Sequence, residues 1–112
     1  MVVDMELSDA EVDRIFRALA DRTRRDILRR TLEAEQSVSA LAATYEVSFA
    51  AVQKHVAVLE AAHLVVKRAD GRERLVRADP ATIARARRLL ADYEHLWRAR
   101  IDRLDDLLAE DP

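Results

Sequence analysis

The chain has 112 residues, of which 50% are apolar and 36% are charged, with a formal net charge of −2 and no cysteine. This length suits one domain with a single modest core, and the balance of apolar and charged residues excludes a disordered chain and a membrane protein. The lack of cysteine excludes disulfides, thiolate metal ligands and thiol redox sensing. No apolar run could span a bilayer and no signal-peptide pattern opens the chain, so we expect a cytoplasmic protein.

Charge is unevenly distributed along the chain. Residues 1–13 carry only acidic charges, and residues 102–112 carry five acidic side chains against one arginine. Between these ends, residues 17–30 hold six arginines against two aspartates, and residues 48–77 hold six cations against three acidic side chains. A basic middle between acidic ends can present one positive face to a phosphate backbone while the remaining surface stays acidic and soluble.

The first two predicted helices begin at residues that cap helix N-termini. Ser8, followed three residues later by Glu11, forms a capping-box pattern and predicts a first helix over residues 8–20. Asp21 can cap a second helix over residues 21–33. The predicted buried sides are formed by Val12, Ile15, Phe16 and Leu19 in the first helix, and by Ile27, Leu28 and Leu32 in the second. The arginines of the second helix then lie on its outer side.

Two further helices form a predicted helix-turn-helix. Either Ser37 or Ser39 can cap a brief helix over residues 39–45, and Ser48 can cap the next helix over residues 48–62. Only residues 46–48 separate the two helices, which fits the tight corner of this motif. One side of the later helix is apolar, with Val52, Val56, Leu59 and Ala62 at spacings of three and four.

The opposite side of the helix over 48–62 has the composition of a DNA recognition helix. Its small residues, such as Ala50, let the backbone approach a surface closely. Gln53 and Lys54 can reach base edges or phosphates in a major groove about 12 Å wide. The alternative is an ordinary amphipathic core helix with a solvated face, and the flanking segments decide between the two.

After Leu64 the apolar pattern changes from helical spacing to alternation, which predicts two strands within residues 64–77. Between them lies Ala69-Asp70-Gly71-Arg72, and Asp-Gly is a strong hairpin signal because Gly tolerates a positive φ. A two-stranded ribbon tipped with arginines directly after a helix-turn-helix describes a wing that follows the DNA backbone. The alternative is a small hairpin that only closes the core.

A long helix is predicted over residues 80–109. Asp79 can cap it, and Pro80 suits the first helical position, where the missing amide proton costs nothing. Its apolar stripe contains Ile83, Leu90, Tyr93, Trp97, Ile101, Leu104 and Leu108. At 1.5 Å per residue the helix extends roughly 45 Å, which is more than one small domain can cover. We therefore expect it to pack against another chain; the alternative is a helix that wraps its own domain.

The motifs in this order resemble the ArsR family of bacterial winged-helix repressors over nearly the whole chain. The resemblance is carried by Ala18-Leu19-Ala20-Asp21-Arg22-Thr23-Arg24-Arg25-Asp26-Ile27-Leu28, by Val38-Ser39-Ala40-Leu41-Ala42, by the segment from Ser48 to Leu59 with His55, and by Leu64-Val65. It implies a homodimer, held by its first and last helices, that binds a partly palindromic operator and represses transcription. It also implies a cytoplasmic bacterial protein that associates with the nucleoid when bound to DNA.

Three positions or sites depart from the family pattern. Gln53 stands where the family often has serine, and His63 stands where it favours glycine. The backbone at the end of a recognition helix often needs a positive φ, which costs a non-glycine residue on the order of 1 kcal/mol. The cysteines of thiol-based sensors are missing, and Asp92 with His95 does not reproduce the spacing of the family's zinc site. We therefore expect no metal and no cofactor.

Two surfaces are predicted from the residues and the resemblance together. The DNA-binding surface comprises Ser48, Phe49, Ala50, Gln53, Lys54, His55, Arg68, Arg72 and Arg74. The dimer interface comprises Val12, Ile15, Phe16, Leu90, Tyr93, Trp97, Ile101, Leu104 and Leu108.

The expected function is that of a dimeric, sequence-specific transcriptional repressor that binds double-stranded DNA. One alternative is a protein-interaction module whose long final helix recruits a partner. A further alternative is a repressor released by a small-molecule or metal effector, with Tyr93 and Trp97 lining a pocket between the long helices. We expect no enzyme, because no catalytic triad, carboxylate pair or glycine-rich phosphate loop is present.

Overall fold

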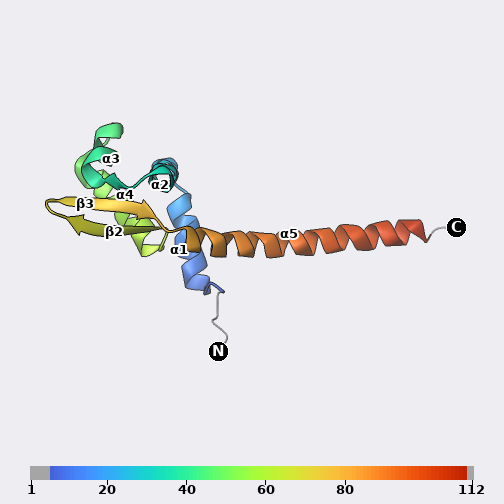
Figure 1. Cartoon of the computed structure of the whole chain (residues 1–112). Coiled ribbons are helices and arrows are strands. Elements are labelled where there is room, and N and C mark those ends of the chain that lie inside the picture. Colours follow the sequence, from blue (N-terminus) through green and yellow to red (C-terminus); the bar gives the residue numbers. More distant parts are fainter. Residues whose placement is uncertain (1–5, 111–112) are drawn as a thin grey trace, which may run out of the picture.

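A computed structural model describes residues 6–110 of the chain as five helices and three short strands. In chain order these are α1 (Asp9–Leu19), α2 (Arg22–Glu33), β1 (Gln36–Ser37), α3 (Val38–Thr44), α4 (Phe49–Ala61), β2 (Val65–Asp70), β3 (Glu73–Ala78) and α5 (Pro80–Ala109). Figure 1 shows α1 to α4 and the strands gathered in one body, from which α5 extends as a straight rod. This is a winged helix-turn-helix, as the sequence predicts.

The helices begin at the side-chain caps that the sequence predicts. The Ser8 hydroxyl accepts a hydrogen bond from the Glu11 amide at 3.2 Å, and the Glu11 carboxylate accepts one from the Ser8 amide at 3.0 Å, which completes a capping box. The Asp21 carboxylate accepts from the Arg24 amide to cap α2, and the Ser48 hydroxyl accepts from the Ala51 amide to cap α4. Of the two candidates for α3, Ser37 is the cap, so α3 begins at Val38 and not at residue 39.

The strands form a three-stranded antiparallel sheet in the order β1-β3-β2. The sequence does not predict β1, because two residues are too few for a visible alternation. In the wing, Asp70 pairs with Glu73, so the loop consists of Gly71 and Arg72 alone. Gly71 has φ 61° at the first loop position, as in a type II′ turn. The turn is therefore shorter than the four-residue segment 69–72.

The core lies between α1 to α4 and the sheet. Its largest fully buried side chains are Ile15, Ile27, Leu41, Leu59, Leu64, Val52, Val56, Val65, Val76 and Thr82. Three sequence predictions are wrong here. Phe16, predicted on the buried side of the first helix, is 42% exposed on α1. Ile15, predicted at the dimer interface, is 1% exposed in the single chain, because it faces the core and not the outer side of α1. Leu32, predicted on the buried side of α2, is half exposed near the end of that helix.

The apolar stripe of α5 has almost nothing to pack against among residues 6–110. Only the beginning of the helix joins the body, where Thr82 is buried and Ile83 and Ala86 pack against the core. Farther along, the large apolar side chains of the stripe are exposed, from 36% at Ile101 to 75% at Leu108. The molecule measures 73 × 40 × 24 Å as a result. None of the helices within residues 6–110 combines the length and the apolar character needed to cross a membrane.

Candidate nucleic-acid interface

Helix α4 has one buried side and one exposed side. Val52, Val56 and Leu59 are completely buried in the core. The other side exposes Ala50, Gln53, Lys54 and Ala57, and Phe49 stands exposed in the first turn. The small alanines leave the backbone accessible between the longer polar side chains. This side can therefore approach a large surface closely while Gln53 and Lys54 reach out from it.

The wing tip and the start of α4 share one groove of about 430 Å³. Phe49 and Gln53 line it from α4, and Arg72 and Arg74 line it from the wing. Ser39 at the start of α3 also contributes. The two-residue turn at Gly71 is what brings the arginines to this position, because it ends the ribbon beside the first turns of α4. Four residues of the predicted DNA-binding set thus meet at one place.

The polar side chains around this groove have no partner in the part of the chain that the structure describes. Among the described residues, Gln53, Lys54, Arg72 and Arg74 make no hydrogen bond or ion pair with any other side chain or backbone group. Unpaired amide and guanidinium donors on an exposed surface remain free to bind a ligand rich in hydrogen-bond acceptors.

Arg68, also in the predicted DNA-binding set, has a partner. Its Nε and Nη2 donate to the two carboxylate oxygens of Glu35 at 3.2 and 2.9 Å. The guanidinium also lowers the pKa of the Glu35 carboxyl below its usual value, chiefly through these hydrogen bonds. The charge of Arg68 is therefore neutralised locally, and this pair connects the wing to the residue that precedes β1.

His55 lies on the side of α4 that faces α2. Its Nδ1 is 3.4 Å from Nη1 of Arg24 and 3.9 Å from a carboxylate oxygen of Asp21, and its side chain is only 22% exposed. Because arginine only donates, the imidazole Nδ1 accepts this hydrogen bond. The His55 side chain, predicted as part of the DNA-binding surface, thus packs α4 against α2 and stays partly exposed between the two helices.

Two arginines of α2 complete the C-terminus of α1. Arg24 donates from Nη2 to the Arg17 carbonyl at 2.9 Å and from Nε to the Ala18 carbonyl at 2.8 Å, and Arg25 donates to the Leu19 carbonyl at 2.8 Å. The last carbonyls of a helix have no partner within the helix, so these bonds stabilise its end. The basic run of residues 17–30 is therefore only partly a free positive surface.

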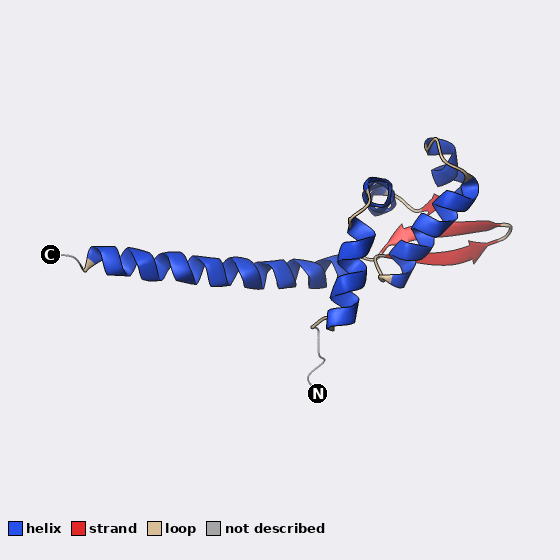
Figure 2. Cartoon of the chain, turned by 180° about the vertical axis from the view of Figure 1, so that it is seen from behind, coloured by secondary structure: helices blue, strands red, loops and turns tan. Residues whose placement is uncertain are grey.

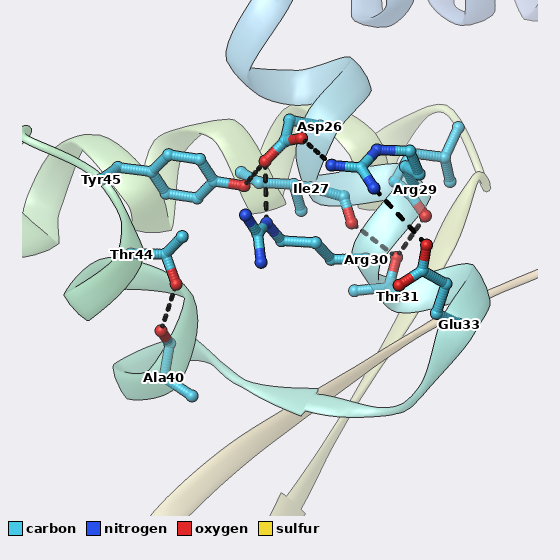
Figure 3. Close-up of polar contacts among 10 residues, drawn as sticks. Asp26, Ile27, Arg29, Arg30, Thr31, Glu33, Ala40, Thr44 and Tyr45 are labelled. Atoms are coloured by element: carbon cyan, nitrogen blue, oxygen red, sulfur yellow. Dashed lines mark hydrogen bonds and ion pairs between the residues drawn. The ribbon is translucent and has the colours of Figure 1, made fainter.

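A polar network fixes the turn of the helix-turn-helix to α2 (Figure 3). The Asp26 carboxylate accepts hydrogen bonds from the Tyr45 hydroxyl, from Arg29 at 2.6 Å and from Arg30 at 2.8 Å. The Arg30 guanidinium also lies 5.8 Å from the centre of the Tyr45 ring. Since Tyr45 directly follows α3 and precedes the turn into α4, the network holds this corner against α2.

The network changes the acidity of its members. The hydrogen bond from Tyr45, followed by those from Arg30 and Arg29, holds the pKa of the Asp26 carboxyl well below its usual value. Burial and the bond to Asp26 raise the pKa of Tyr45 to about 12. Sequence reasoning missed this cluster, because Asp26 and Tyr45 are 19 positions apart and belong to no recognisable motif.

The described part of the chain offers no clear metal centre. Within residues 6–110, no three histidine, aspartate or glutamate side chains gather as metal ligands. Asp92 and His95 both lie exposed on α5.

Comparison with known proteins agrees with this architecture. A family model described as a helix-turn-helix domain matches residues 19–68. The HTH-type transcriptional regulator Rv2034 of Mycobacterium tuberculosis (strain ATCC 25618 / H37Rv) is 39% identical over 85 residues, which cover 76% of this chain and 77% of that protein.

Solved structures have the same fold. The ArsR-like transcriptional regulator from Rhodococcus sp. RHA1 is 36% identical, with a TM-score of 0.78 over 88% of this chain and 92% of that one. The homodimeric winged helix-turn-helix domain of Mb0332 from Mycobacterium bovis is 24% identical, with a TM-score of 0.61 over 80% of this chain and 91% of that one, and shares the fold. The fold and the exposed α4 define a DNA-binding transcriptional regulator. The chain belongs to the ArsR family of winged helix-turn-helix regulators.

Proposed function

We propose that this regulator is a homodimeric repressor that binds a partly palindromic operator. The observation that carries the proposal is the groove in which α4 and the wing bring Gln53, Arg72 and Arg74 together without any partner inside the described part of the protein. A dimer bound at a promoter occupies DNA that the transcription machinery needs, and this occupation is the simplest route to repression.

The exposed side of α4 contacts the bases in this proposal. In the major groove, the Gln53 amide suits the paired donor and acceptor of adenine, and the Lys54 ammonium suits the two acceptors of guanine. The exposed ring of Phe49 can contact a thymine methyl group. Ala50 and Ala57 keep the helix surface low enough for these side chains to reach the bases. The bases contacted would then define each half of the operator.

The wing positions the protein on the duplex in this proposal. Arg72 lies in the two-residue turn and Arg74 one residue into β3, so both guanidiniums lie at the end of the ribbon. Contacts to phosphates set register and orientation without reading sequence, and they make binding dependent on salt. The wing therefore supplies general affinity, while α4 supplies discrimination between sequences.

The second copy is expected at α5. Six apolar side chains of the predicted interface, namely Leu90, Tyr93, Trp97, Ile101, Leu104 and Leu108, lie uncovered along this helix. Phe16 on α1 is exposed as well, and Val12 is partly buried. Pairing two copies along these residues removes the apolar surface from water and places two α4 helices on one duplex. Half-sites would then lie about one helical turn apart, or a multiple of it.

The substitution Gln53→Ala tests base reading. We expect binding to the operator to weaken by ~1–3 kcal/mol per half-site, while binding to random DNA stays unchanged, because each copy of the dimer loses one bidentate base contact. The measurement is fluorescence anisotropy at fixed salt, with the DNA upstream of the protein's own gene as the operator candidate. Arg74→Ala is the matched comparison, since loss of a phosphate contact weakens binding to both DNAs alike.

Two results would contradict the proposal. If Gln53→Ala weakens operator and random DNA equally, Gln53 does not read a base. If the unaltered protein fails to shift any DNA at low salt, the winged helix-turn-helix serves another purpose, and recruitment of a protein partner by α5 becomes the better interpretation.

A further inference from the structure

A second groove, of about 520 Å³, lies along the outer side of α2. It is lined by Arg22, Thr23, Arg25, Asp26 and Arg29 from α2 and by Tyr45 from the corner before α4. Three guanidinium groups and one carboxylate therefore meet here, which leaves an excess of positive charge. None of these arginines belongs to the DNA-binding set that the sequence predicts.

The three arginines differ in how they are held. Arg25 uses one nitrogen for the Leu19 carbonyl, and Arg29 uses two nitrogens for Asp26 and Glu33. Arg22 is exposed and makes no hydrogen bond or ion pair within residues 6–110. A guanidinium carries five N–H donors, so Arg25 and Arg29 still have N–H groups available to bind a ligand. The groove thus combines two arginines held by hydrogen bonds, Arg25 and Arg29, with Arg22, which has no partner within residues 6–110.

The groove flanks α4 on the side opposite the wing. Figure 2 shows α2, seen nearly along its axis, beside α4, and the contact between Arg24 and His55 joins the two helices. Ala51, His55 and Val58 are the partly buried residues on this flank of α4. Phe49 and Gln53 face the wing on the other flank. The recognition helix therefore runs between two separate groups of cations.

We propose that Arg22, supported by Arg25 and Arg29, binds phosphates of the DNA strand on the edge of the major groove opposite the edge contacted by the wing. A major groove is bounded by one phosphate backbone on each side, so a helix inserted in it meets phosphates on both flanks. The wing provides cations for one edge, and the outer side of α2 provides them for the other. The inference rests on the proposed function and extends it to a second set of contacts.

DNA is the occupant that the geometry favours. The groove is an open surface feature with cations spread along about two turns of α2, from Arg22 to Arg29. A row of this kind matches successive phosphates of a strand. A free phosphate ion is the competing occupant, and it would bind without any dependence on the duplex.

The test compares Arg22→Ala, Arg72→Ala and Arg87→Ala in the full chain, with the DNA upstream of the gene and with random DNA. Arg87 is an exposed arginine of α5 outside both grooves, so Arg87→Ala controls for the lost charge. For Arg22→Ala we expect the slope of log affinity against log salt to fall in magnitude by about 1.8, because each of the two copies in the dimer loses one phosphate contact worth about 0.9. Binding to both DNAs should weaken ~5–10-fold per lost contact at 0.1 M salt. Arg87→Ala should match the unaltered protein. An unchanged thermal midpoint for Arg22→Ala would show that the fold is intact.

Phosphate ethylation interference then locates the contact. Arg22→Ala and Arg72→Ala should each lose interference at a different set of phosphates, on opposite edges of the same major groove. The inference is overturned if Arg22→Ala keeps the full salt slope while Arg72→Ala reduces it, if both variants lose the same phosphates, or if Arg22→Ala abolishes binding of inorganic phosphate and leaves DNA binding intact. If the unaltered protein binds neither DNA, the proposed function itself fails, and that result is distinct from the other three.

Discussion

Helices α4 and α5 have the same kind of apolar periodicity, but the apolar side of α4 is buried and that of α5 is exposed. In α4, Val52, Val56 and Leu59 are fully buried by the rest of the chain. In α5, Leu90 remains 53% exposed and Leu108 75% exposed, although both belong to an equally regular stripe. The comparison shows that regular spacing of apolar residues predicts a helix side that will be buried. It does not predict whether the same chain or a second chain buries it. The length of α5 accounts for the difference, because the rest of residues 6–110 contacts only the beginning of this helix.

The two helices also differ in what their remaining side chains can do. The exposed side of α4 carries unpaired hydrogen-bond donors and small residues, which suits contact with DNA. The exposed side of α5 is apolar, which suits contact with another protein surface. Each helix therefore contributes one half of the proposed function, and substitutions can test the halves separately.

The largest expected effect comes from placing a charge in the apolar stripe of α5. Leu104→Glu should raise the dimer dissociation constant by about 100-fold, because the symmetric interface must then bury two carboxylates without partners. Sedimentation velocity over a range of concentrations measures the change. Leu32→Glu on α2 is the matched control, since Leu32 and Leu104 are 49% and 47% exposed.

The control decides what the result means. Leu32→Glu should leave the dimer intact, because α2 lies outside the proposed interface. If both variants dissociate equally, or if the unaltered protein is a monomer at high concentration, α5 is not the site of pairing and the contrast with α4 needs another explanation.

A smaller effect is expected at the polar network that supports the start of α4. Asp26→Asn should lower the free energy of unfolding at pH 7 by about 2 kcal/mol, because hydrogen bonds to a charged acceptor are replaced by weaker ones. The pKa of Asp26 is lowered in the folded state, so its contribution is present above the unfolded pKa of about 3.9 and is lost as the pH falls toward the folded value.

Chemical denaturation of both proteins between pH 7 and pH 3 checks this linkage. The stability difference between the unaltered chain and Asp26→Asn should shrink below about pH 4. Glu33→Gln is the control, because within residues 6–110 Glu33 makes only an exposed contact of 3.5 Å with Arg29. A stability difference that is independent of pH would show that the carboxylate charge of Asp26 does not stabilise the corner.

The smallest effect concerns the backbone at the end of α4. His63 has φ 60°, which confirms the positive φ expected where the family favours glycine, and Gly71 in the wing has nearly the same φ of 61°. His63→Gly should therefore raise stability by about 1 kcal/mol, whereas Gly71→Ala should lower it by a similar amount. A Cβ at position 71 meets no atom within 4 Å, so its cost comes from the backbone alone.

Thermal unfolding of the two variants measures these opposite shifts. A lower thermal midpoint for His63→Gly would contradict a relief of backbone strain at the end of α4. A neutral Gly71→Ala would indicate that the wing turn relaxes to another type.

Local signals made most of the fold predictable from the sequence. The caps at Ser8, Asp21, Ser48 and Asp79 depend on neighbouring residues only, and each of them begins a helix in the structure. The wing followed from alternating apolar residues around the single glycine. For the groove between α4 and the wing, the sequence predicts the two segments that form it, since both carry exposed basic or polar residues and follow one another in the chain. It does not predict that their side chains meet in one groove.

Long-range pairing set the limits of prediction. Strand β1 exists because Gln36 and Ser37 meet β3, and two residues show no alternation of their own. The basic run 17–30 appeared as a free charged face, yet Arg24 and Arg25 bond to the end of α1. The sequence predicts Ile15 at the interface because spacing alone does not distinguish the core side of α1 from its outer side.

Hydroxyl-radical footprinting of the DNA upstream of the gene tests most directly whether paired α4 helices enter a duplex. With the unaltered chain we expect two protected segments on one face of the DNA, separated by about 10–10.5 base pairs or a multiple of that spacing. With Gln53→Ala we expect this protection to weaken at the same protein concentration. A single protected segment, or uniform cleavage at saturating protein, would contradict a dimer that reads an operator through α4.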